Sequence, residues 1–336
     1  MTVGLGCIGY GAWGRNVARV AASTPGARLL AVADLEAERR EEARERHPGV
    51  EILPDDESLL RRDDLDAVLI ATDAASHADL VVRAAERRRH VFVEKPLALC
   101  AADARRAVAA AREMEVRLQV GHLLRYHPAV EVLFDVVRGE LGTLRSVACQ
   151  RLNFGAVRRD ESVLFSLGAH DLSLMLALFG RPPESVAAHG AAYVQQGVED
   201  LAFVTLRFPG GGIGQMHLSW LDPHKVRRVT VVGSEAMAVF DDMEPREKVR
   251  IYDQAVRPPE SPWIYGENLS LRYGSIRIPP CPAREPLRVE LAHFVECLRQ
   301  GRPPRTGGEE GLRVVEILEA AQRSLRAGGA PAEIGR

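Results

Sequence analysis

The stretch Val3-Gly-Leu-Gly-Cys-Ile-Gly9-Tyr10-Gly11-Ala12-Trp13-Gly14 decides the fold. Its apolar half, Val3 to Ile8, predicts a buried strand, and the glycine-rich half opens a helical pattern over 12–22. Glycines at this spacing let the backbone turn sharply and approach a pyrophosphate, which then lies against the amides at the helix N-terminus. The stretch therefore predicts a dinucleotide-binding βα unit.

The second predicted strand, Leu29 to Ala33, ends immediately before Asp34. A carboxylate at this position can hydrogen-bond the adenosine ribose hydroxyls and would repel the extra phosphate of NADP, so the expected cofactor is NAD. The alternative is that Asp34 only caps the next helix.

Strand and helix patterns alternate over the rest of the first third of the chain. Further strands are expected over 67–71, 91–94 and 118–121, separated by helical patterns over 36–46, 77–88 and 101–114. This alternation predicts a doubly wound parallel sheet of the Rossmann type, covered by helices on both faces. Such sheets bind ligands at the carboxyl ends of their strands.

The pattern changes after residue 122. Helices are expected over 128–138 and 167–179, and strands over 144–154, 186–193, 201–208, 213–220, 226–232 and 236–240. A long loop over 257–286 and helices over 287–300 and 309–325 complete the chain. We expect a Rossmann domain over 1–122 and an α+β domain over 123–336 with a mostly antiparallel sheet, its last helix packing back on the first domain.

Bulk properties exclude several classes of protein. The 336 residues carry a formal net charge of −2, are 46% hydrophobic, and contain no run near the roughly 18 apolar residues that span a bilayer. The first residues lack the basic segment of a signal peptide, and five scattered cysteines show no zinc or redox spacing. We expect a cytoplasmic protein that binds no metal, membrane or nucleic acid.

Lysine is scarce in this chain. Of the 44 basic residues, three are lysines (Lys95, Lys225 and Lys248), which leaves 41 arginines. A lysine amine can exchange its proton near neutral pH when its surroundings lower its pKa, whereas an arginine cannot. Lys95 follows the strand over 91–94, where it would face the cofactor and substrate; the alternative is a surface lysine paired with Glu94.

Six segments together resemble the Gfo/Idh/MocA oxidoreductase family over essentially the whole chain. They are Gly9 to Gly14, Ala71-Thr72, Glu94-Lys95-Pro96, Gly121-His122, Gly168-Ala-His170-Asp171 and Gly311-Leu-Arg-Val-Val-Glu. The resemblance implies that Lys95 holds the reacting hydroxyl, that His170 is the acid/base, and that the Lys95-Pro96 peptide is cis. A histidine suits proton transfer near neutral pH. The expected cofactor-binding residues are Gly9, Tyr10, Gly11, Ala12, Trp13, Gly14, Asp34, Thr72, His77, Glu94, Lys95 and His122.

Three other histidines have open roles. His122 and His127 flank a strand end and could touch cofactor or substrate, while His77 resembles a cofactor-side residue of the family and could equally cap its helix. No cluster of histidine, cysteine and carboxylate residues indicates a metal site.

The chain departs from many relatives at Ser166, four residues before His170, where they carry an aspartate. A serine cannot serve as a carboxylate base. Either His170 and Lys95 suffice, or Asp160, Glu161 or Asp171 takes part of the role. The expected substrate residues are Arg125, Arg158, Ser166, Asp171 and Lys225.

Six cations in two short segments exceed what a neutral polyol needs. They bind an anionic group of the substrate, or they belong to a solvated sheet edge or a subunit contact. Of the six, Arg158 and Lys225 are the candidates for substrate binding. The set is Arg151, Arg158, Arg159, Lys225, Arg227 and Arg228.

The sequence therefore predicts an NAD-dependent oxidoreductase acting on a hydroxyl or keto carbon of a sugar or nucleotide-linked sugar. The expected assembly is a homo-dimer or homo-tetramer. Two alternatives remain open at this point: a glycosidase-type elimination that uses the same oxidation transiently, and a non-catalytic NAD-binding sensor or scaffold.

The first testable prediction concerns Asp34. NADH should bind at least tenfold more tightly than NADPH, or about 1.4 kcal/mol, because the 2′-phosphate would face a carboxylate. Fluorescence titration with both cofactors measures the ratio. Comparable affinities would contradict the assignment of Asp34.

Overall fold

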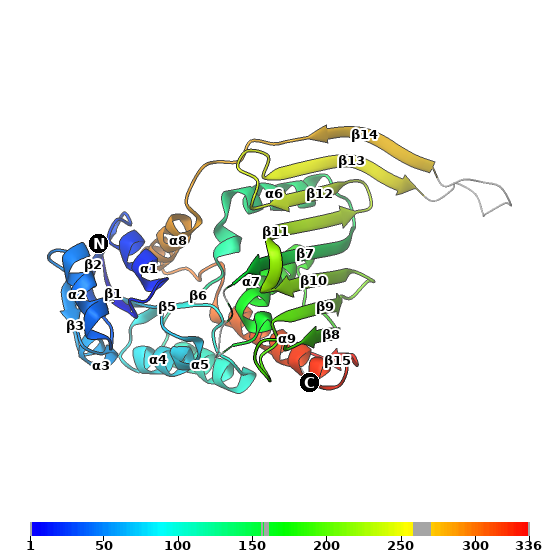
Figure 1. The fold of residues 1–336 in the computed structure, drawn as a ribbon. Coiled ribbons are helices and arrows are strands. Elements are labelled where there is room, and N and C mark those ends of the chain that lie inside the picture. The colour runs from blue at the N-terminus through cyan, green and yellow to red at the C-terminus, as the bar shows by residue number, and fades with distance from the viewer. Residues whose placement is uncertain (1, 156, 158–160, 258–269, 335–336) are drawn as a thin grey trace. The chain divides into compact units, whose positions relative to one another are not determined.

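The computed structural model describes residues 2–155, 157, 161–257 and 270–334. These residues form two compact units (Figure 1). One comprises Met1–Tyr126 and Arg284–Glu316, and the other comprises His127–Ala283 and Ile317–Arg336. The first unit is therefore discontinuous in sequence, because a segment near the C-terminus folds with it.

The first unit is built on a six-stranded sheet in the order β3-β2-β1-β4-β5-β6, and its neighbouring strands pair in parallel. This confirms the doubly wound Rossmann sheet. The strands are β1 (Val3–Ile8), β2 (Ala27–Ala33), β3 (Glu51–Leu53), β4 (Ala67–Ile70), β5 (His90–Glu94) and β6 (Leu118–Gly121).

Two apolar clusters cover the two faces of this sheet. One contains residues of α3, α4 and α5, and the other contains residues of α1, α2 and α8. Phe294 of α8 packs on Phe92 of β5, with ring centroids 6.0 Å apart, which explains why α8 belongs to this unit. The helices are α1 (Gly14–Ala21), α2 (Ala37–Arg46), α3 (Asp56–Leu60), α4 (Ala74–Glu86), α5 (Ala101–Glu113), the 3-10 turn η1 (Leu123–Tyr126) and α8 (Pro286–Gln300).

The second unit is built on a nine-stranded sheet in the order β14-β13-β12-β11-β7-β10-β9-β8-β15. Its neighbouring strands pair antiparallel except for β10 and β7, which pair in parallel; this confirms a mostly antiparallel sheet. The strands are β7 (Leu144–Phe154), β8 (Ser185–Ala191), β9 (Leu201–Arg207), β10 (Ile213–Ser219), β11 (Leu221–Gly233), β12 (Met237–Asp241), β13 (Val249–Arg257), β14 (Ser270–Arg277) and β15 (Ala332–Glu333).

The helices of this unit include a π-helical turn, η2 (Leu164–Gly168), that leads directly into α7 (Ala169–Phe179). Side chains alternate along the strands: on β9, Ala202, Val204 and Leu206 are buried, whereas Phe203 is exposed. One sheet face therefore carries the core. The remaining helices are α6 (Pro128–Gly139) and α9 (Gly308–Arg326), along which the boundary between the units falls.

The structure corrects the loop expected over 257–286. Its part over 270–277 is strand β14, which pairs antiparallel with β13. Several of its side chains are exposed, including Leu271 and Tyr273, so the strand lacks the apolar alternation that a buried face imposes. Residues 258–269 of the expected loop lie outside the described part of the chain. The sequence also gave no signal for β3 and α3, which have three and five residues.

The sequence predicts neither a membrane-spanning helix nor a metal site, and the described ranges can be searched for both. Within them, no helix is long and apolar enough to cross a membrane. The same ranges contain no group of three or more histidine, cysteine, aspartate or glutamate side chains placed to hold a metal ion. These findings concern the described residues alone.

Candidate functional site

The glycine-rich turn between β1 and α1 requires glycine at two of its three positions. Gly9 has φ of 92°, and a Cβ there would lie 2.7 Å from the carbonyl oxygen of Ala71. A Cβ on Gly14 would lie 2.1 Å from the carbonyl oxygen of Gly9. At Gly11 the nearest atom to a Cβ is 3.7 Å away, on Arg39. The close packing of β1 and α1 therefore fixes Gly9 and Gly14, whereas Gly11 leaves the backbone accessible.

Asp34 holds this turn from the end of β2. Its buried carboxylate accepts hydrogen bonds from the backbone N–H groups of Tyr10, at 2.6 Å, and Glu36, at 2.9 Å. Glu36, not Asp34, is the N-cap residue of α2. The guanidinium of Arg39 approaches Asp34 to 3.8 Å. Asp34 thus brings a negative charge to the carboxyl edge of the sheet, where the first two βα turns meet.

Glu94 at the end of β5 is a buried carboxyl linked to the same turn. Its Oε1 accepts a hydrogen bond from Nε1 of Trp13 at 2.5 Å, and its Oε2 accepts from the backbone N–H of Lys95 at 3.3 Å. Burial raises the pKa of Glu94 to about 7, against the opposing effects of the Trp13 hydrogen bond and the Lys95 charge. A Cβ on Gly121 of β6 would lie 3.1 Å from this carboxyl, so the glycine makes room for it.

The Lys95-Pro96 peptide bond is cis, which confirms the expectation from the sequence. His77 of α4 supports this turn: Nδ1 lies 2.7 Å from the carbonyl oxygen of Pro96, and Nε2 lies 3.0 Å from that of Thr72. Burial lowers the pKa of His77, so the ring is neutral and donates to one of the two carbonyls. His77 therefore joins the ends of β4 and β5.

His122, just after β6, is 1% exposed, and both of its ring nitrogens lack a hydrogen-bond partner among the described residues. Burial, with added repulsion from Arg125 and Lys95, lowers its pKa to about 3. His122 is therefore a neutral ring beside the lysine. Arg125 is paired with Glu310 at 2.7 Å, so its charge is already balanced within the first unit.

In the second unit, His170 lies in the first turn of α7 and is partly buried. The adjacent Asp171 is 1% exposed and forms an ion pair with the buried Arg151 of β7, with Nη2 and Oδ1 2.7 Å apart. Ser166 is buried in the π-helical turn that precedes α7. The Arg151–Asp171 pair fixes the start of α7 on the sheet and occupies the carboxylate beside His170.

Of the six cations in the two short segments, most of those that the structure describes are paired with carboxylates. Arg227 lies 3.5 Å from Asp242, and Arg228 lies 3.1 Å from Asp241, in addition to the Arg151 pair. Lys225 of β11 is exposed and forms no ion pair with the described residues. Arg158, Arg159 and Asp160 lie outside the described residues.

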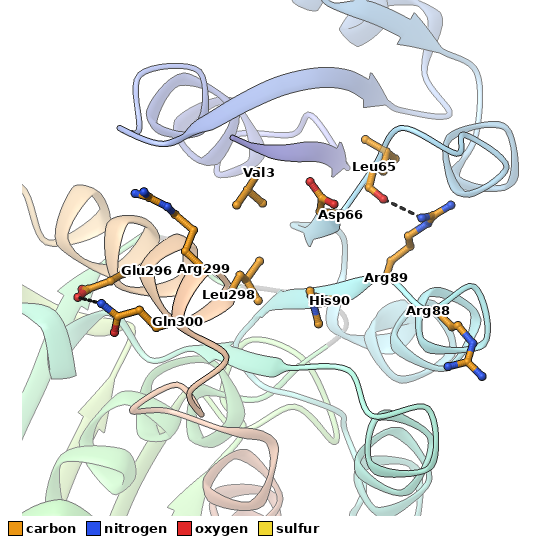
Figure 2. Close-up of a pocket in the computed structure, with 10 residues that line it drawn as sticks. All are labelled: Val3, Leu65, Asp66, Arg88, Arg89, His90, Glu296, Leu298, Arg299 and Gln300. Atoms are coloured by element: carbon orange, nitrogen blue, oxygen red, sulfur yellow. Dashed lines mark hydrogen bonds between the residues drawn. The ribbon is translucent and has the colours of Figure 1, made fainter. Parts of the chain in front are cut away.

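A pocket of about 810 Å³ lies at the opposite edge of the parallel sheet, by the amino ends of β1 and β5 (Figure 2). Arg89 donates to the backbone carbonyl of Leu65 at 2.7 Å. Figure 2 shows the side chains of Arg88 and Arg299 on opposite sides of the pocket, not converging. Since parallel sheets bind ligands at their carboxyl edge, this pocket is separate from the cofactor site.

The sequence indicates Trp13 and Glu94 separately but does not predict the hydrogen bond between them. It also does not predict the Arg151–Asp171 pair. The proximity of Trp13 and Glu94 could have been expected, because Trp13 follows β1 and Glu94 ends β5. The carboxyl ends of parallel strands share one edge of the sheet. No signal linked Arg151 to Asp171, which are 20 residues apart.

Family models match both halves of the chain. A model described as an oxidoreductase family with an NAD-binding Rossmann fold matches residues 3–122, and a GFO/IDH/MocA C-terminal domain model matches residues 135–239. The chain belongs to the Gfo/Idh/MocA oxidoreductase family. The sequence resemblance is thereby confirmed.

Relatives match over nearly their full length. A structure from Magnetospirillum magnetotacticum is 31% identical, with a TM-score of 0.81, and the match covers 95% of this chain and 99% of that one. The UDP-N-acetylglucosamine 3-dehydrogenase structure from Acidithiobacillus ferrooxidans is 26% identical, with a TM-score of 0.84 and coverage of 98% and 99%. The myo-inositol 2-dehydrogenase of Thermotoga maritima is 27% identical, with 96% of each chain covered.

NAD is the cofactor of this Gfo/Idh/MocA chain, and the first unit fits it. The turn at Gly9 and Gly14 leaves no room for side chains, so backbone amides are presented at the start of α1. The Asp34 carboxylate would face the adenosine ribose of a bound NAD, and Glu94 and Lys95 lie at the end of β5, at the same edge of the sheet.

The glycine turn yields a prediction with a matched control. Gly14→Ala should destabilise the protein by at least about 2 kcal/mol, because its Cβ would overlap a backbone carbonyl that cannot move aside. Gly11→Ala should change stability by less than about 0.5 kcal/mol, because its Cβ would make only ordinary van der Waals contact with Arg39, and it should weaken NADH binding at least tenfold, because the Cβ would face the cofactor. Denaturant unfolding and NADH titration of both variants measure the difference. Equal stability of the two would contradict this account of the turn.

Proposed function

We propose that this protein is an NAD-dependent dehydrogenase or reductase that transfers a hydride between nicotinamide and a hydroxyl or keto carbon of a sugar or nucleotide-linked sugar. The main support for this proposal is the position of Lys95, one of three lysines in the chain, directly after β5 at the carboxyl edge of an NAD-binding sheet. Relatives that act on inositol and on UDP-N-acetylglucosamine support the substrate class.

Lys95 and His170 have complementary roles in this proposal. Oxidation of a carbinol removes a hydride from carbon and a proton from oxygen; NAD accepts the hydride. The Lys95 ammonium donates to the substrate oxygen and polarises it, and the His170 imidazole accepts the hydroxyl proton. In the reductive direction, His170 returns the proton to the carbonyl oxygen.

The arrangement around α7 supports His170 as the proton acceptor. Ser166 supplies no carboxylate, and the carboxylate of Asp171 is occupied by the buried guanidinium of Arg151. Burying an ion pair is tolerated only when both charges are well compensated, so Asp171 is held as the partner of Arg151. The role of Asp171 in this proposal is to orient the first turn of α7.

The preference for NAD over NADP is part of the proposal. The buried Asp34 carboxylate supports it, because an added phosphate would approach a fixed negative charge. Arg39, 3.8 Å from Asp34 and 2.9 Å from Glu36, reduces that repulsion. The measured ratio of NADH to NADPH affinity shows how much Arg39 lowers the repulsion between Asp34 and the 2′-phosphate.

We also propose a cytoplasmic homo-dimer or homo-tetramer. The outward face of the nine-stranded sheet supports a subunit contact: Phe203 is 44% exposed and stacks on His217 with centroids 4.3 Å apart, and Ile213 is 46% exposed. Exposed apolar groups on a sheet face are typical of protein contact surfaces.

Substitutions at the two proposed catalytic residues test the chemistry. Lys95→Arg keeps the positive charge but changes the hydrogen-bond geometry and removes the exchangeable amine, so kcat should fall by roughly 100-fold or more. His170→Ala should cause a loss of similar size. Both variants should still bind NADH, because the turn at Gly9–Gly14 and Asp34 is unchanged.

Lys248→Arg is the matched control, since this lysine lies in the second unit and pairs with Asp242 at 3.5 Å. Turnover on a panel of sugars is followed by NADH absorbance. Retention of most activity by both Lys95→Arg and His170→Ala would show the assignment to be wrong. NAD binding with no turnover of any sugar would favour the sensor alternative, and glycoside cleavage without net NADH would favour transient oxidation.

The substrate class has its own test. If Arg158 and Lys225 bind an anionic group, a nucleotide-linked sugar should have a higher kcat/KM than the free sugar, and added salt should weaken its binding. Lys225→Ala should reduce this advantage, whereas Arg228→Ala, which removes the same charge from a residue paired with Asp241, should not. Equal kcat/KM for both substrates, with no loss in Arg158→Ala, would limit these cations to a surface role.

A further inference from the structure

A second buried carboxyl group lies in the cofactor-binding unit, on the helix that returns to it from the C-terminal part of the chain. Glu290 of α8 is 0% exposed, and neither of its carboxyl oxygens has a hydrogen-bond partner among the described residues. Unpaired buried polar atoms are uncommon because each one costs about 1–3 kcal/mol. Glu290 therefore needs an explanation beyond packing.

Strand register places Gln119 on the same side of the sheet as this helix. Gln119 of β6 lies opposite Phe92 of β5, and Phe92 packs on Phe294, one turn after Glu290 on α8. Gln119 is also 0% exposed, and its amide nitrogen and oxygen have no partner among the described residues. Two buried polar side chains thus face the same layer between the sheet and α8.

Glu94 belongs to this layer as well, because it is two residues after Phe92 and side chains alternate along a strand. Its electrostatic interaction with Glu290, after burial, raises the pKa of Glu290 well above the usual value. The nearby Tyr126 lies 3.1 Å from Thr306 Oγ1, which in turn donates to the carbonyl of Val120.

Two neighbouring buried carboxyl groups do not both ionise readily. Glu94 accepts hydrogen bonds from Trp13 and from the backbone of Lys95, and the Lys95 charge also favours its ionised form. Glu290 has no such donors among the described residues. The negative charge of the pair therefore resides on Glu94, and Glu290 retains its proton.

We propose that Glu290 is a neutral carboxylic acid that, together with Gln119, binds internal water against Glu94 and so positions Glu94 and Trp13 for NAD binding. An internal water makes about three hydrogen bonds to such groups, and a protonated carboxyl and an amide supply both donors and acceptors. Glu290 is a positioning residue that acts through Glu94. The proposal rests on NAD binding and is independent of the substrate.

The consequence is a polar link from α8 to the glycine-rich turn. Trp13 is 41% exposed in that turn, and its Nε1–H bond to Glu94 connects it to the end of β5. Glu290 is 277 residues from Trp13 in sequence, yet through Glu94 it would influence the side of the cofactor pocket that Trp13 forms. Loss of this link should weaken NADH binding without changing the fold.

The experiment compares NADH affinity in the full-length protein and three variants. Glu290→Gln preserves the shape and neutrality of a protonated glutamate and should bind NADH within about twofold of the natural protein, whereas Glu290→Leu should weaken binding at least fivefold. Glu296→Gln, an exposed carboxyl on the same helix, is the control and should have no effect. Thermal unfolding and circular dichroism establish that each variant is folded.

Protonation is measured directly and through pH dependence. At about pH 8, above the pKa of about 7 that burial gives Glu94, the infrared spectrum should show the carbonyl band of a protonated carboxylic acid, which Glu290→Gln abolishes and Glu296→Gln retains. The pH profile of NADH affinity should be the same in the natural protein and Glu290→Gln. If Glu290 were ionised, the glutamine would remove a repulsion, lower the pKa of Glu94, and shift the profile toward lower pH.

Such a shift, or absence of the band, would overturn the proposal. A folded Glu290→Leu variant that binds NADH as tightly as the natural protein would also overturn it, because the side chain at position 290 would then contribute packing alone. If Glu290→Leu does not fold, Gln119→Leu takes its place with the same expected fivefold loss. Each measurement uses NADH and no sugar, so failure of the proposed substrate class leaves this result unaffected.

Discussion

The close approach of α1 to β1 is the constraint on which the cofactor-binding unit depends. A side-chain carbon on Gly14 would lie 2.1 Å from the carbonyl oxygen of Gly9, so the helix can begin at this point only with glycine there. The same approach places the Tyr10 backbone N–H against the carboxylate of Asp34, which connects β1 to β2. The backbone amides at the start of α1 are thereby directed to the carboxyl edge of the sheet, where anions bind.

Charge at that edge is controlled by burial. Glu94 is buried, yet its two oxygens accept hydrogen bonds from Trp13 and Lys95, so an anion beside the lysine is possible near neutral pH. His122, which also lies beside Lys95, is kept neutral by burial and by repulsion from two cations. Glu94 and His122 are therefore both buried near Lys95 but differ in charge. Glu94 receives hydrogen bonds that favour its ionised form, whereas His122 has no such partners among the described residues.

In the second unit, ion pairs determine which charged residues remain available. Arg151 and Asp171 neutralise each other inside the protein, and Arg227 and Arg228 lie near Asp242 and Asp241. Among these cations, Lys225 differs in lying outside these pairs. A count of charges along the sequence therefore overestimates the charge that a substrate meets, because pairing across strands is not visible in the sequence.

The sequence by itself determined the Rossmann sheet, NAD as the cofactor, the cis Lys95-Pro96 peptide and the mostly antiparallel second sheet. Those features depend on local spacing of glycines, on strand and helix periodicity, or on motifs contained within a few residues. Only the tertiary structure decided that α8 packs in the first unit, that β14 is a strand, and that Asp171 is held by Arg151. Each of these features depends on contacts between segments that are distant in sequence. Such contacts become favourable only when folding removes both partners from water.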